Sequence, residues 1–121
     1  MLFNKHQIEI NKFENDLDAY IYFSTKKQEA IRKRENDNVI AHLEITEKKG
    51  KLQLQRTINS YCENHDPKTL MNIVKTRADE CDKKIEKLRA KGKSTVNETI
   101  KSLVYRQTKL MIAKNTLDKI F

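Results

Sequence analysis

The second half of the chain carries two runs of apolar residues spaced alternately three and four positions apart. The first run consists of Met71, Val74, Ala78, Cys81, Ile85 and Leu88. The second consists of Val96, Ile100, Leu103, Leu110, Leu117 and Phe121, interrupted by Gln107 and Lys114. An average spacing of about 3.5 residues places each run on one stripe of an α-helix, and another helix must cover such a stripe. The pattern therefore predicts an antiparallel helical hairpin made of residues 67–91 and 95–121.

Local start and stop signals fit this hairpin. Asp66 can cap its first helix, and Pro67 fits the first turn, where a missing amide hydrogen does no harm. Gly92 is typical of a helix end, and Thr95 and Glu98 have the spacing of a capping box. The second helix also has a widened apolar face, to which Val104, Met111, Ile112, Ala113 and Ile120 belong. A face of that width predicts contact with more than one neighbouring helix.

The first part of the chain predicts another long helix, from Phe3 to about Arg34. Its apolar stripe consists of Phe3, Ile10, Phe13, Leu17, Tyr20 and Ile31. The end of this helix is basic, which is favourable near a helix C-terminus. The segment 35–38 then reads as a break, because its asparagine and aspartate residues favour caps and turns.

Residues 39–62 fit two structures. As a β-hairpin, residues 39–58 alternate apolar and polar positions, and Gly50 supplies a positive φ in the loop. As a helix, the segment leaves Ala41, Ile45 and Leu52 on the side opposite its main stripe, and a central glycine costs about 1 kcal/mol relative to alanine. The helix is favoured because four helices of similar length close into a bundle, whereas a lone hairpin needs other elements to cover it.

Composition agrees with narrow apolar stripes on long helices. Hydrophobic residues make up 37% of the chain and charged residues 35%, and there are only two glycines and one proline, fewer turn residues than many short strands need. We therefore predict a single all-α domain over residues 1–121, folded as an antiparallel helical bundle. The alternative is a mostly helical fold with one β-hairpin at 39–58.

The formal net charge of +8 lies entirely in the predicted C-terminal hairpin. Residues 1–66 hold 11 Lys/Arg and 11 Asp/Glu, whereas residues 67–121 hold 14 Lys/Arg and 6 Asp/Glu. A basic half of this kind attracts nucleic acid, an acidic protein face or an anionic membrane surface. The candidate nucleic-acid-binding residues are Arg77, Lys83, Lys84, Lys87, Arg89, Lys91 and Lys93.

A row of such cations can follow a phosphate backbone, with about one counterion released per contact. The same positions also flank the apolar stripe, where charged residues ordinarily pair with acidic residues of a neighbouring helix. No helix-turn-helix signature is present, and aromatic residues are too few to form a stacking platform for bases. The sequence therefore favours binding without sequence preference.

Enzymatic and metal sites fit the sequence poorly. The turn at Gly92 imitates the end of a phosphate-binding P-loop, but Lys87 stands where that loop needs glycine, and a helix precedes it. Cys62 and His65 have a tolerable zinc-ligand spacing, but Cys81 has no close companion. The three histidines are scattered, without a nucleophile or carboxylate at an informative spacing. We expect no catalytic site, no metal and no cofactor.

The sequence thus predicts a small, non-enzymatic, basic helical protein that docks on nucleic acid or another polyanion through its C-terminal half. The alternative is a protein–protein interaction module: an adaptor, an export chaperone or a coiled-coil subunit. In that case the protein uses the wide apolar face of the last helix, or the four consecutive apolar and aromatic residues at 20–23. Either surface would meet an acidic or helical protein partner, or a second copy of the chain. No apolar run reaches membrane-spanning length and no signal-peptide pattern begins the chain, so we expect a cytoplasmic protein.

Overall fold

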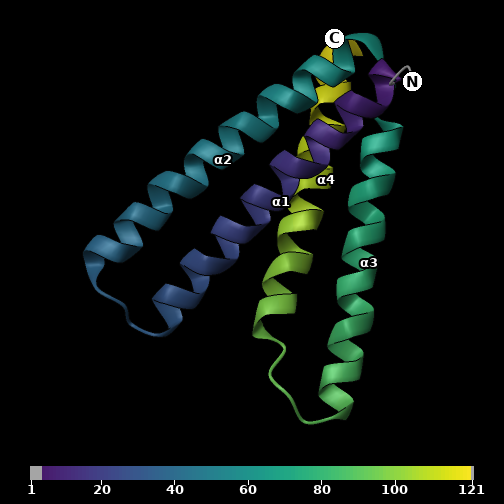
Figure 1. The fold of residues 1–121 in the computed structure, drawn as a ribbon. Helices are drawn as coiled ribbons and strands as arrows, with labels where there is room; N and C mark the ends of the chain where they lie inside the picture. Colours follow the sequence, from purple (N-terminus) through teal and green to yellow (C-terminus); the bar gives the residue numbers. More distant parts are fainter. Residues whose placement is uncertain (1–3, 121) are drawn as a thin grey trace.

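The computed structural model describes the backbone of residues 4–120 and the side chains of residues 4–115. It contains four helices: α1 Lys5–Arg32, α2 Asp37–Asn64, α3 Lys68–Ala90 and α4 Val96–Ile120. Helices α1 and α2 form one antiparallel hairpin, and α3 and α4 form a second (Figure 1). The predicted all-α bundle is confirmed, as is the C-terminal helical hairpin. Phe3 and Phe121 lie outside the described residues, as do the side chains of Leu117 and Ile120.

The two hairpins meet at one end and separate toward the other (Figure 1). The common end holds the start of α1, the end of α4 and the α2–α3 connection, while the α1–α2 and α3–α4 turns lie at the far ends of the two hairpins. Helix α4 contacts α1 and α2 in addition to its hairpin partner α3. The prediction that the last helix meets more than one neighbour is therefore confirmed.

The core gathers one group of side chains from each helix. The fully buried ones are Phe13, Leu17, Leu54, Ile58, Leu70, Val74, Thr108 and Ile112. The stripe predicted for α3 is largely correct, because Val74, Ala78, Cys81 and Ile85 are buried. Met71 and Leu88 are half-buried, and the fully buried Leu70 lies outside the predicted stripe. Burial of this kind contributes roughly 1.5–3 kcal/mol for each large aliphatic or aromatic side chain, so these residues hold the hairpins together.

The alternative β-hairpin at residues 39–58 is wrong, because these residues lie within α2. Gly50 does not occupy a turn. It lies where α2 passes close to α1, and a Cβ atom placed on it would be 3.6 Å from the Cα atom of Tyr20. The side chains that alternation placed on a sheet face, such as Ile45 and Leu52, instead lie on the outside of α2, with exposed fractions of 54% and 57%.

The apolar stripe predicted for the last helix is also partly wrong. Leu103 and Leu110 are exposed, by 55% and 71%. Helix α4 instead buries the neighbouring face, which includes two hydroxyl side chains. Thr108 is buried because its Oγ1 donates to the carbonyl of Val104 at 2.9 Å, and a satisfied hydroxyl can enter a core at little cost.

The helix ends show which local signals were correct. Asp66 caps α3, since its Oδ1 accepts from the amide of Lys68 at 2.9 Å. Gly92 ends α3 with φ 68°, and the amide of Lys93 bonds to the carbonyl of Leu88 at 2.9 Å, as in a Schellman motif. The capping box at 95–98 does not form among the described residues, because the Glu98 carboxylate turns inward toward cations instead.

Candidate functional site

Six of the seven candidate cations are exposed, and the five that form no ion pair with a described side chain lie toward the tip of the α3–α4 hairpin. We call this group the basic tip, and it consists of Lys83, Lys87, Arg89, Lys91 and Lys93. Helix α3 carries the first three into its final turns, and the Schellman turn at Gly92 carries the other two. No acidic side chain in the described part of the chain forms an ion pair with any of them. Their charges are therefore available to an external anion.

Arg77 plays a different part. Its guanidinium reaches across to α1, where Nη2 lies 3.1 Å from Oε2 of Glu14 and Nη1 donates to Asp18. The Arg77 side chain is only 22% exposed. Burial alone lowers the pKa of Arg77, but its hydrogen bond to Asp18 and the charge of that carboxylate, with a contribution from Tyr105, outweigh burial and raise it. Arg77 therefore joins the two hairpins and has little surface left for a ligand.

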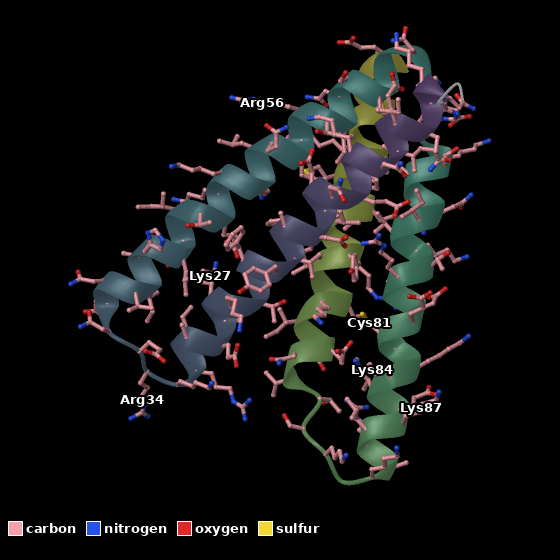
Figure 2. The ribbon with its side chains drawn as sticks, viewed as in Figure 1. Lys27, Arg34, Arg56, Cys81, Lys84 and Lys87 are labelled. Atoms are coloured by element: carbon pink, nitrogen blue, oxygen red, sulfur yellow. The ribbon has the colours of Figure 1, made fainter. Side chains whose placement is uncertain are left out.

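Lys84 is paired across the hairpin, although 62% of its side chain is exposed. Figure 2 shows it on the side of α3 that faces α4, and its Nζ lies 3.3 Å from Oε1 of Glu98. The Glu98 side chain is only 11% exposed and also faces Lys101 at 3.7 Å. A buried carboxylate must be compensated by nearby charge, and these two lysines supply it. Of the predicted line formed by Arg77, Lys84 and Lys91, only the last is unpaired.

The Cys81 thiol lies beside this buried carboxylate. Burial, together with the charge of Glu98 and a hydrogen bond to it, raises the pKa of Cys81 to about 11. At neutral pH the group is therefore a protonated thiol, which is a poor nucleophile and a poor metal ligand. In the part of the chain that the structure describes, no group of three His, Cys, Asp or Glu side chains is placed to hold a metal ion.

Two clefts open between α1 and the α3–α4 hairpin, and both are lined by Lys84 and Glu98. The cleft nearer the turns has a volume of about 520 Å³ and also contacts Glu29, Arg32 and Lys33 of α1. The second cleft, of about 440 Å³, extends toward Arg77. Positive and negative side chains nearly balance in both, and most are already paired with one another. These clefts therefore attract anions less strongly than the basic tip does.

Sequence reasoning missed a cluster at the common end of the hairpins. His6 from the start of α1 and His65 from the end of α2 stack with ring centroids 4.3 Å apart. Nε2 of His6 lies 2.7 Å from the hydroxyl of Tyr61, and Nε2 of His65 lies 2.7 Å from Oε2 of Glu9. The second contact is not aligned as a hydrogen bond, since that oxygen has no hydrogen-bond partner among the described atoms.

This cluster ties the first turns of α1 to the last turns of α2. The histidines are 59 positions apart in the sequence, so no spacing rule could have paired them. Only the helical path of α2, which the ambiguous segment 39–62 left open, brings the two rings together. Among the described residues, the cluster does not provide a group of side chains that could hold a metal ion. Its contacts are those of a partly buried polar network that joins two helices.

None of the four helices, over the residues described, has a stretch apolar enough to cross a membrane. The chain matches no protein-family model, no curated protein and no solved structure with which it was compared.

Proposed function

We propose that the protein binds a polyanion, nucleic acid in the first place, through the basic tip, and performs no chemistry on it. The observation that supports this is the set of five exposed cations of the basic tip, none of which is paired with a described acidic side chain. Across residues 83–93 there are six cations and one acid, Glu86, a net charge of +5 in 11 residues. Holding so many like charges together costs electrostatic energy, which a polyanion would relieve.

The spacing within the basic tip fits a repeating anion. Lys83, Lys87 and Lys91 follow one another at four-residue intervals, so their Cα atoms advance about 6 Å per step along the helix. Their long, flexible side chains can adjust to successive phosphates. No large apolar side chain in the described part of residues 83–95 is exposed. Contacts to the backbone, without base stacking, are therefore expected.

The test is fluorescence anisotropy with labelled duplex DNA, single-stranded DNA and RNA at low and moderate salt. If all five cations contact phosphates of a duplex, the affinity should fall with a log–log salt slope of roughly −4 to −5. Absence of binding at low salt would refute the proposal. A salt slope near zero would also contradict it, since phosphate contacts by lysine necessarily release counterions.

The decisive variant is Lys87→Glu with Lys91→Glu. Lys84 is left unchanged, because reversing its charge would place a carboxylate against the buried Glu98 and disturb the fold. The matched control is Lys48→Glu with Lys49→Glu, two exposed lysines on α2 that lie on the other hairpin. Both pairs change the net charge by the same amount. We expect the tip variant to lose at least about tenfold in affinity and the control to lose little. Equal losses would show that only net charge matters.

A further inference from the structure

The outer face of α4 combines exposed leucines with positive charge. Leu103 and Leu110 are seven residues apart, which places them on the same side of the helix. Leu110 is 71% exposed, more than any other large apolar side chain in the described part of the chain. A pair of exposed leucines on one stripe commonly marks a surface that another molecule covers, because burying them would gain free energy that is absent while they face water.

All charges of this helix between Thr99 and Lys114 have one sign. The segment holds no Asp or Glu, and its cations are Lys101, Arg106, Lys109 and Lys114. Lys101 faces the buried Glu98, and Arg106 is bonded to Asp82 of α3. Lys109 has no ion pair with a described acidic side chain, and it lies on α4 one residue before Leu110. The exposed stripe is therefore apolar along its centre and positive at its border.

A hollow lies beside the stripe. Leu103 borders a cleft of about 370 Å³ between α4 and the α1–α2 hairpin, together with Tyr20 and Ile100. The one ion pair in this cleft, Lys27 with Glu47 at 2.8 Å, is internally satisfied. A helix lying along α4 could place an apolar side chain into the hollow while its own stripe covers the two leucines.

The charge of this face distinguishes between three possible ligands: a second copy of the chain, a nucleic acid and an acidic helix. A second copy packed α4 against α4 would bring Lys109 and Lys114, which form no ion pair with a described acidic side chain, close to the same lysines of its partner, and like charges repel across an apolar seam. A nucleic acid would neutralise the cations but would leave the leucines in water. An acidic amphipathic helix satisfies both, because its stripe covers the leucines and its flanking carboxylates meet the cations.

We propose that the outer face of α4 is a docking site for an acidic amphipathic helix of another protein. The leucine pair at 103 and 110 anchors this helix, and Lys109 and Lys114 set its preference for glutamate or aspartate at the flanking positions. This site is distinct from the basic tip, so each can be removed without the other.

The probe is a labelled synthetic helical peptide of three heptads, with leucine at the a and d positions and glutamate at e and g. A second peptide has lysine in place of each glutamate. We expect the acidic peptide to bind in an anisotropy titration and the basic peptide not to bind. Leu103→Ser with Leu110→Ser should weaken binding by about tenfold or more, because each leucine loses its apolar cover. Circular dichroism checks that the variant remains folded.

Two controls locate the binding. Ile45→Ser with Leu52→Ser removes an exposed pair on α2 with the same seven-residue spacing and similar exposure, and it should leave the affinity within about twofold. The Lys87→Glu and Lys91→Glu variant should also bind the peptide nearly unchanged. The proposal fails if the acidic peptide does not bind or if the double serine variant on α4 binds it as well as the unchanged protein does. It fails as well if the double serine variants on α4 and on α2 weaken binding equally. It also fails if sedimentation shows a dimer that the serine pair on α4 abolishes, since a second copy would then cover this face.

Discussion

Replacing Gly50 with alanine should stabilise the protein, although this glycine lies at a close approach of two helices. The residue is in the interior of α2, and its φ is not in the positive region that favours glycine. An alanine Cβ would meet the Cα, N and Cβ atoms of Tyr20 at 3.6, 3.9 and 4.0 Å, which are ordinary van der Waals distances. The substitution therefore fits without displacing α1.

The expected magnitude follows from helix propensity. Glycine in a helix interior is about 0.8–1.0 kcal/mol less favourable than alanine, chiefly because the unfolded chain has more conformations to lose. New contacts between the methyl group and Tyr20 should add a few tenths of a kcal/mol, on the order of a weak dispersion contribution. We expect Gly50→Ala to raise the free energy of unfolding by about 1 kcal/mol and the Tm by roughly 3–6 °C.

The assay is urea and thermal unfolding followed by circular dichroism. Gly92→Ala is the matched control, because Gly92 has φ 68° and a Cβ there would meet no atom within 4 Å. Strain alone should then destabilise that variant by roughly 1–2 kcal/mol. If Gly50→Ala instead destabilises the protein by about 0.5 kcal/mol or more with an unchanged m value, the close-approach geometry is wrong. A turn at residues 47–50 would give that result.

Three further predictions concern single positions. Arg34 has φ 56° at the end of α1, so Arg34→Gly should raise the free energy of unfolding by about 1 kcal/mol in urea titrations, and a loss of stability would contradict the left-handed conformation. A double-mutant cycle of Arg77→Met and Asp18→Asn should give a coupling free energy of about 0.5–1 kcal/mol. The value is modest because the Asp18 side chain is 60% exposed. A coupling of zero would mean that the bridge between the hairpins does not form in solution. The free energy of unfolding should fall as the pH rises from about 9 to about 11. In the unfolded chain the Cys81 thiol releases its proton near its ordinary pKa of 9.0, whereas in the folded protein burial beside Glu98 raises that pKa to about 11. Between these pH values the unfolded state alone gains from losing the proton. The raised pKa values of Tyr20 and Tyr105, both caused first by burial, act in the same direction at higher pH, and Cys81→Ala should flatten the curve nearest pH 9 in urea midpoints.

Local pattern was sufficient for most of α3, where the buried side chains belong to the predicted stripe with the exception of Leu70. It was insufficient for α4, because spacing alone treats every leucine as a core residue. In the structure Thr108 and Ser102 enter the interior, since one hydroxyl donates to the carbonyl of Val104 and the other to Asp82. The leucines were displaced to the outer face. A pattern rule that counts apolar residues cannot foresee that a satisfied hydroxyl takes a core position.

The candidate site was predictable only where it depends on residues close in sequence. The basic tip is one such case, since its cations follow one another on α3 and in the adjoining turn. The engagement of Arg77 was not predictable, because its partners Glu14 and Asp18 are 63 and 59 positions away. The stacked histidines are another long-range case. Both depend on α2 being one long helix of the first hairpin, in the segment where the strand and helix patterns conflicted.

The separation of the two hairpins away from their common end has a consequence for folding. Most tertiary contacts join α1 to α2 or α3 to α4, so each hairpin closes from residues near one another in the chain. Such topologies have low contact order and fold quickly. Docking of the hairpins requires long-range contacts, including the Arg77 bridge, whose partners Arg77 and Glu14 are 63 positions apart. Amide exchange should therefore reveal two cooperative units that open independently at their turns and share their slowest-exchanging amides where α1 crosses α4.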